Sequence, residues 1–183
     1  MRCQCQRDKI VRAKLDAIPK RFEDSRLTNY VPMDSKQQAV LDTVAKDFTK
    51  NFFFHGNYGR GKTHLAVAQY VELVKIERPC CFISIHDLVS ELRRSEMDPD
   101  YFCTVRQRVR HEKQFHVIVD DLDKFKPTDF RFEALYDFFN KIYANKLGLT
   151  ITSNYSLQQL AEANLLDGAI LRRIDEICEA VEV

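Results

Sequence analysis

The chain has 183 residues, the length of one domain, and its 28 Lys and Arg residues nearly balance its 27 Asp and Glu residues. The resulting net charge of +1 predicts neither nucleic-acid nor membrane binding, so any basic surface must be local. No apolar run approaches the roughly 18–20 residues of a membrane span, and Met1–Cys5 lacks a signal peptide's apolar stretch. We therefore expect a cytoplasmic protein, in which the cysteines are free thiols or metal ligands.

The first part of the chain is polar and rich in charge. We expect residues 1–35 to form an N-terminal extension and residues 36–183 to form the core. Residues 7–17 have the composition of a short helix that ends before a proline. Residues 22–33 show no clear period and are expected to be an extended lead-in.

The core alternates short apolar runs with amphipathic stretches. Its first apolar run is aromatic and ends at a glycine, as expected for a buried strand, and the stretches between the runs have apolar residues at helical spacing. This alternation predicts an α/β fold, a three-layer αβα architecture with a central parallel sheet. In chain order we predict a helix at 35–48, a strand at 51–55, a helix at 63–75, a strand at 80–85, helices at 86–94 and 101–113, a strand at 116–119, a helix at 132–143, a strand at 149–152, a helix from Ser156, a helix at 170–177 and an edge strand at 181–183.

A glycine-rich loop lies between the first predicted strand and the helix that follows it. Its pattern is Gly, four residues, then Gly-Lys-Thr, and the strand-loop-helix context is what makes this pattern informative. The glycines let backbone N–H groups point inward, and the helix N-terminus favours phosphate. Lys62 is long enough to reach the β- and γ-phosphates, and the Thr63 hydroxyl can bind Mg²⁺. The loop predicts a P-loop NTPase that binds ATP or ADP through Gly56, Asn57, Tyr58, Gly59, Arg60, Gly61, Lys62, Thr63 and His64.

Two acidic residues follow the third predicted strand. A parallel sheet delivers them at its carboxyl edge, beside the phosphate loop. We predict that Asp120 holds Mg²⁺ together with Thr63, and that Asp121 orients and deprotonates the attacking water. Related ATPases often have Glu at the second position, and Asp is shorter by one methylene, so the water must lie closer or turnover must be slow.

With these motifs placed, the chain resembles the DnaC/DnaI/IstB-like branch of the AAA+ ATPases, which are replicative helicase loaders and transposition helper ATPases. The resemblance covers nearly the whole chain. It is most specific at residues 18–22, 56–63, 117–122 and 152–157. It implies an AAA+ core, and the short segment after Arg173 implies that this core lacks a full helical lid.

The resemblance also implies roles that spacing alone does not give. Asn154 matches the sensor-1 position, where its amide would bind the γ-phosphate or the attacking water. Arg173 best matches the arginine finger that reaches the ATP of a neighbouring subunit, with Arg172 as the alternative. Cys3 and Cys5 match half of a family zinc site, but two thiolates cannot close a four-ligand site, so we expect no zinc unless two subunits share it.

A run of arginines lies in the stretch between the second and third predicted strands. In the related ATPases this region faces DNA, so the resemblance implies phosphate contacts to single-stranded DNA that are sequence-independent and salt-sensitive. The alternative is a solvated helical face, partly neutralised by nearby acids. The residues concerned are Arg93, Arg94, Arg106, Arg108 and Arg110.

The leading hypothesis is a helicase-loader ATPase acting in DNA replication. It would bind ATP·Mg²⁺, assemble with itself, and engage single-stranded DNA and a replicative helicase. The alternatives are a transposition helper ATPase with a transposase as partner, a non-hydrolysing adaptor or inhibitor of a helicase, and a small-molecule kinase.

Overall fold

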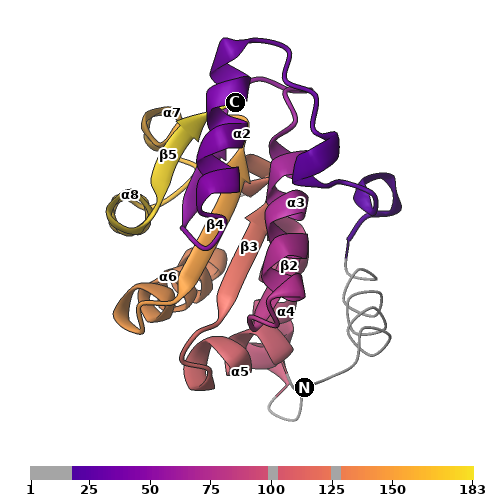
Figure 1. Ribbon diagram of the computed structural model, residues 1–183. Coiled ribbons are helices and arrows are strands. Elements are labelled where there is room, and N and C mark those ends of the chain that lie inside the picture. The colour runs from indigo at the N-terminus through magenta and orange to yellow at the C-terminus, as the bar shows by residue number, and fades with distance from the viewer. Residues whose placement is uncertain (1–17, 99–102, 125–128) are drawn as a thin grey trace.

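The computed structural model describes residues 18–98, 103–124 and 129–183 (Figure 1). The helix expected at 7–17 and the Cys3–Cys5 pair lie outside these residues. The described chain forms one sheet of five parallel strands in the order β2-β3-β4-β1-β5. The strands are β1 (Phe52–His55), β2 (Cys80–Ser84), β3 (His116–Asp120), β4 (Gly148–Ser153) and β5 (Glu179–Glu182).

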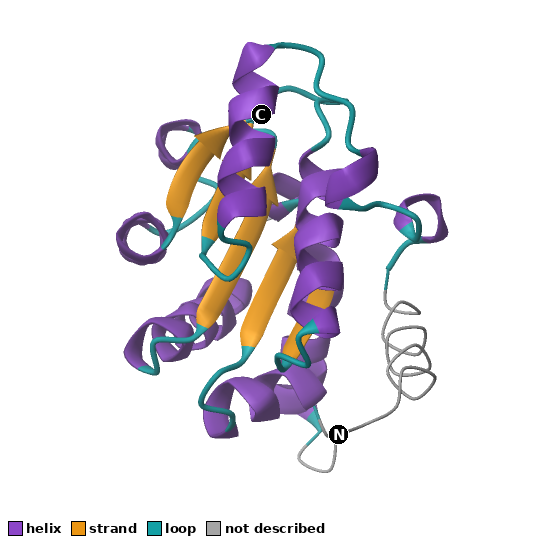
Figure 2. Cartoon of the chain, in the orientation of Figure 1, coloured by secondary structure: helices purple, strands orange, loops and turns teal. Residues whose placement is uncertain are grey.

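Helices cover both faces of this sheet, which confirms the predicted three-layer architecture (Figure 2). Side chains alternate between the faces along β1. Phe53 packs in the cluster that contains α4 to α8, whereas Phe52 and Phe54 pack in the cluster that contains α2 and α3. The helices are α2 (Ser35–Lys46), α3 (Lys62–Lys75), α4 (Ile85–Met97), α5 (Thr104–His111), α6 (Asp129–Ala144), α7 (Leu157–Glu162) and α8 (Gly168–Ile177).

The segment before α2 differs from the expected extended lead-in. It contains two short 3₁₀ helices, η1 (Lys20–Phe22) and η2 (Leu27–Asn29). Ile18 and Tyr30 are buried in the same cluster as α3, because this segment crosses the start of that helix. The division of the chain at residue 35 stays a prediction.

The strand order positions the functional loops. Since all five strands are parallel, the loops after β1, β3 and β4 emerge at one edge of the sheet, and β1 and β3 lie on either side of β4. The loop after β1 is the glycine-rich loop, the loop after β3 carries the two acids, and Asn154 follows β4 directly. Within the described residues, no helix is long and apolar enough to cross a membrane.

Candidate nucleotide-binding site

The glycine-rich loop turns sharply between β1 and α3. Gly56, Gly59 and Gly61 all have positive φ, at 133°, 77° and 91°. Space is also restricted at two of them. A Cβ on Gly61 would lie 2.6 Å from the Tyr30 ring, and one on Gly56 would lie 2.6 Å from the carbonyl oxygen of Val183. The glycine pattern is therefore required by the backbone and by its close neighbours.

The N-terminus of α3 is open at the end of this loop. Its N-cap is Gly61, which has no side chain to accept from the first backbone N–H groups of the helix. Four other helices are capped by a side chain, namely α2 by Asp34, α4 by Ser84, α7 by Ser156 and α8 by Asp167. The open helix end and the positive end of its dipole fit an anion such as phosphate.

Lys62 is the first residue of α3, and its side chain folds back over the loop. It is only 6% exposed, and its Nζ donates to the carbonyl oxygens of Gly56 at 2.8 Å and Asn57 at 2.7 Å. Burial lowers the pKa of the Lys62 ammonium, while the nearby carboxylates, first of all Asp123, act to raise it. The ammonium is thus held in the concave side of the loop by weak neutral acceptors, where phosphate oxygens would be stronger partners.

The segment before α2 braces the outer side of the loop. The Arg60 carbonyl oxygen accepts from Tyr30 Oη at 3.1 Å and from Gln37 Nε2 at 3.0 Å, and the Arg60 guanidinium forms an ion pair with Asp34. His64 Nε2 lies 3.0 Å from the Arg26 carbonyl oxygen. The side chains of Arg60 and His64 therefore hold the loop in place in this structure.

The two predicted Mg²⁺ ligands are hydrogen-bonded to each other. Thr63 Oγ1 donates to Asp120 Oδ1 at 3.0 Å, although the two residues come from different elements. Asp120 is buried and also accepts from Thr152 Oγ1 at 2.6 Å. Burial raises the pKa of the Asp120 carboxyl, and the hydrogen bond from Thr152 acts in the opposite direction. A hydroxyl beside a carboxylate is a donor set that fits Mg²⁺, which prefers oxygen ligands.

Asp121 and Asn154 lie on the other side of the same cavity. Asp121 has a φ of 58°, and its backbone N–H donates to Thr152 Oγ1 at 2.9 Å. Asn154 donates its backbone N–H and its Nδ2 to the two carboxylate oxygens of Asp123, each at 2.8 Å. The Asp123 side chain is only 3% exposed, so it fixes the orientation of the Asn154 amide.

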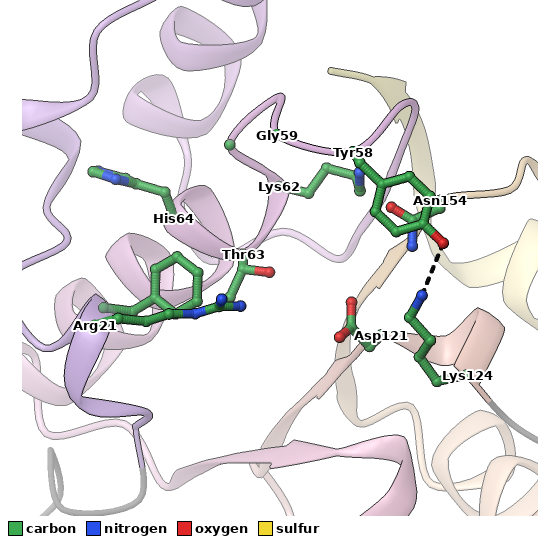
Figure 3. A pocket seen from close by; sticks show the side chains of 11 residues that line it. Arg21, Tyr58, Gly59, Lys62, Thr63, His64, Asp121, Lys124 and Asn154 are labelled. Carbon is green, nitrogen blue, oxygen red and sulfur yellow. Dashed lines mark hydrogen bonds between the residues drawn. The ribbon is translucent and has the colours of Figure 1, made fainter.

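These residues surround one cavity of about 610 Å³ (Figure 3). Figure 3 shows the side chains of Lys62, Thr63, Asp121, Lys124 and Asn154 around this space. The structure thus brings together the phosphate loop, the predicted base and the sensor-1 residue. The predicted residues that line the cavity are Tyr58, Gly59, Gly61, Lys62, Thr63, His64, Asp121 and Asn154.

Five residues that the sequence analysis did not predict as site residues belong to this site. Thr152 bonds to both acids, and Asp123 holds Asn154. Lys124, Arg21 and Phe22 line the cavity. The sequence signal for Arg21, Phe22 and Thr152 was their place in the segments that carry the family resemblance. For Asp123 and Lys124 it was their nearness to the carboxyl end of β3, where ligands bind in such sheets.

Neither candidate arginine finger lines this cavity. The Arg173 guanidinium donates to the Ala169 carbonyl oxygen at 2.9 Å and to Tyr136 Oη at 3.1 Å, and its Cζ lies 4.7 Å from the centre of the Tyr136 ring. The Arg172 side chain is 81% exposed and pairs with Glu176. Arg173 is packed between α8 and α6, whereas Arg172 is open to solvent.

The predicted DNA-contacting arginines lie far from the cavity. Helix α4 starts at the carboxyl end of β2 and runs back along the sheet for 13 residues, or roughly 20 Å. Helix α5 precedes the amino end of β3 (Figure 1). Arg106 forms ion pairs with acids on α4 and α6, and Arg108 pairs with the acid that ends α5. The exposed members of the cluster are Arg93, Arg94 and Arg110.

The described part of the chain contains no cluster of side chains that could hold a metal ion on its own. Residues 18–98, 103–124 and 129–183 contain no group of three or more His, Cys, Asp or Glu side chains suited to a metal ion. The zinc question at Cys3 and Cys5 falls outside these residues.

Solved structures with the same fold include replication proteins. The crystal structure of the DnaC helicase loader superposes with a TM-score of 0.77 at 26% identity, covering 90% of this chain and 99% of that chain. The crystal structure of DnaI has a TM-score of 0.73 at 21% identity, covering 90% of this chain and 94% of that chain. These likenesses confirm the P-loop NTPase fold.

Two of the curated relatives come from insertion sequences. The IS232 putative ATP-binding protein of Bacillus thuringiensis subsp. berliner is 27% identical over 168 residues, and the IS5376 putative ATP-binding protein of Geobacillus stearothermophilus is 29% identical over 167. Each match covers 88% of this chain, and the chain spans 65% of the length of each relative. The family model described as IstB-like ATP binding protein matches residues 2–183. With the phosphate loop, the paired acids and this match over nearly its whole length, the chain belongs to the family of IstB-like ATP-binding proteins of the AAA+ class.

Proposed function

We propose that this protein is an ATPase that uses ATP binding and hydrolysis as a switch to deliver a protein partner to DNA. The observation that carries the proposal is the composition of the single cavity described above. Lys62, Thr63, Asp121 and Asn154 line this cavity, and the buried Asp120 is hydrogen-bonded to Thr63 directly behind its lining. A phosphate-binding group, a pair of metal ligands, a base and a polar sensor could therefore act on the same phosphate.

The chain's own residues would hold the triphosphate and the cation. Bound ATP with Mg²⁺ would supply the phosphoanhydride bond and a divalent charge beside it. Lys62 would exchange the carbonyl oxygens of Gly56 and Asn57 for phosphate oxygens. The Thr63 hydroxyl and the Asp120 carboxylate, already in contact, would open to hold the cation between them or through water.

Asp121 and Asn154 would act on the attacking water. Asp121 would accept a proton from this water, and its backbone is held in place by Thr152. Asn154 keeps its side-chain oxygen and one amide hydrogen for the water or the γ-phosphate, because Asp123 takes the other side-chain hydrogen.

Steady-state ATP turnover with and without single-stranded DNA tests the enzymatic part of the proposal. Asp121→Asn should lower turnover by at least about 100-fold while ATP binding is retained, since the base would be lost and the fold kept. Lys62→Ala should abolish tight ATP binding. Undiminished turnover in Asp121→Asn would refute the base assignment, and wild-type affinity in Lys62→Ala would refute the phosphate-loop assignment. Tight binding without turnover in the wild-type protein would identify a non-hydrolysing adaptor.

The partner that best fits the structural likeness is a replicative helicase, because the DnaC loader matches over almost its whole chain. A second candidate partner is a transposase, and it is favoured by the insertion-sequence relatives and the family model. Pull-downs against a replicative helicase and a transposase, with ATP and with ADP, separate the two. Retention of neither partner under any nucleotide condition would argue against delivery of a partner altogether.

Assembly and DNA contact complete the proposal. In a homo-oligomer, Arg172 or Arg173 would reach the site of a neighbouring subunit, and Arg173 would first have to leave Tyr136. Single-stranded DNA would bind the exposed part of the basic cluster, Arg93, Arg94 and Arg110. Combined Arg93→Ala and Arg110→Ala substitutions should weaken binding and reduce its salt dependence, whereas an unchanged salt slope would place DNA elsewhere.

A further inference from the structure

A contact across the mouth of the cavity joins the phosphate loop to the loop after β3. Lys124, at the end of η3 (Leu122–Lys124), donates its Nζ to Tyr58 Oη at 2.8 Å, and the same Nζ lies 4.6 Å from the centre of the Tyr58 ring (Figure 3). Tyr58 is in the middle of the phosphate loop and is 72% exposed. Both residues line the cavity. A cation is therefore held beside the phosphate loop by a neutral phenol.

The carboxylate nearest to Lys124 is already engaged. Asp123 Oδ2 lies 3.6 Å from the Lys124 Nζ, but both oxygens of Asp123 accept hydrogen bonds from Asn154 at 2.8 Å. The ion pair with Lys124 is longer than these bonds, and the Lys124 side chain is 44% exposed. The hydrogen bond to Tyr58, together with the surrounding acids, raises the pKa of the Lys124 ammonium, so it stays charged.

The position of this charge suggests what it binds. Lys62 reaches the cavity from α3, and Lys124 reaches it from the loop after β3, on the same side as Asp121. Two ammonium groups that line one space attract an anion into it. The lysine stem is flexible, and a phosphate oxygen is a stronger acceptor for an ammonium than a phenol oxygen.

We propose that Lys124 is an additional phosphate-binding residue that binds the terminal phosphate of a nucleoside triphosphate, and that Tyr58 holds the Lys124 ammonium whenever this phosphate is absent. A diphosphate would not reach Lys124, so the residue distinguishes the two nucleotides from within the same subunit. Exchange of the Tyr58 contact for the phosphate contact would also release the Tyr58 ring at the tip of the loop. This inference rests on the proposed function, since it assumes that the cavity binds nucleotides.

Calorimetric titration of the full chain tests the inference through binding alone. The ligands are ADP and a non-hydrolysable β,γ-methylene analogue of ATP, both with Mg²⁺. Lys124→Met should weaken binding of the analogue about tenfold and change ADP affinity less than about twofold, because a single charge-assisted contact is lost. Tyr58→Phe should strengthen analogue binding about twofold to threefold, because the competing hydrogen bond is removed and the ring is kept.

Matched controls separate the possible failures. Lys113→Met removes the same charge from an exposed turn after α5 and should leave both affinities unchanged. Equal weakening of ADP binding and analogue binding by Lys124→Met, or no effect on either affinity, would overturn the role of Lys124. Its contact with Tyr58 would then only connect the two loops. If Lys62→Ala also bound both nucleotides at wild-type affinity, the nucleotide site itself would be wrong. A normal melting temperature for Lys124→Met is expected, since the side chain is partly exposed.

Discussion

Replacing Asp120 with asparagine should stabilise the protein in the absence of nucleotide while weakening its Mg²⁺-dependent binding. Asp120 is buried, and burial is the main reason why its pKa lies above the ordinary value of 3.8. Asparagine keeps the Oδ1 atom that accepts from Thr63 at 3.0 Å and Thr152 at 2.6 Å. The substitution therefore removes a buried negative charge and preserves the hydrogen-bond acceptor.

The direction of this stability change follows from proton linkage. A raised pKa means that the folded protein keeps the Asp120 proton to a higher pH than the unfolded chain does. Wild-type stability therefore falls as the pH rises from about 4 through the folded-state pKa, and asparagine has no such loss. The raised pKa already includes the favourable hydrogen bonds from both threonines. We expect a gain of about 1 kcal/mol at pH 7, or roughly 2–4 °C in melting temperature for a chain of this size.

Thermal unfolding followed by circular dichroism between pH 4 and pH 8, without nucleotide, measures this effect. The difference between Asp120→Asn and the wild type should be small near pH 4, grow with pH and then level off. Asp175→Asn, the same change at an exposed residue of α8, should shift stability by less than about 0.5 kcal/mol. A loss of stability that grows with pH would refute the reasoning, because the ionised carboxylate would then stabilise the fold, and a loss that is equal at every pH would refute it too, because the charge would then play no part. With ATP and Mg²⁺ present, the wild-type protein should gain more stability than the variant.

Two further predictions concern the supports of the site. Asp123→Ala should lower the free energy of unfolding by about 1–3 kcal/mol, because the Asn154 backbone N–H and amide lose their acceptor. It should also lower ATP turnover with little change in ADP affinity. Unchanged turnover and an unchanged free energy of unfolding would show that Asn154 does not need this support. Gly61→Ala should lower the melting temperature by several degrees more than Gly59→Ala. Both glycines have positive φ, but only a Cβ on Gly61 meets the Tyr30 ring, so equal melting temperatures would show that the ring moves aside freely.

The sequence predicted the strands of the central parallel sheet, but not their order, because each strand has a strong local signal. β1 and β3 are short apolar runs that are buried on both faces, and each is followed by a residue with positive φ, Gly56 or Asp121. Since parallel strands end at one edge, the positions of Thr63 and Asp120 near each other followed from their places at or after the ends of these strands. The helix expected from Ser156 is likewise confirmed, and a capping box between Ser156 and Gln159 marks its start.

The contacts that orient the site could not be predicted in this way. Tyr30 and Gln37 reach the phosphate loop from 30 and 23 residues away in the sequence, and no periodic pattern connects them to Arg60. The 3₁₀ turns before α2 were missed because their few residues have no helical period and are held by packing on α3. The pairing of Arg173 with Tyr136 depends on how α6 and α8 pack, which the spacing within either helix does not determine.

Asp121 shows how such a contact changes the interpretation of a motif. From the sequence, its short side chain was a weakness for a catalytic base, because related ATPases often carry Glu there. In the structure Asp121 has a φ of 58°, a left-handed conformation in which Asp is found more often than most other non-glycine residues. The hydroxyl of Thr152 fixes this conformation through the Asp121 N–H and also donates to Asp120. One buried threonine thus links the predicted base to the predicted metal ligand. A change in the charge of Asp120 would therefore be felt at Asp121, so the two acids should be tested as a pair.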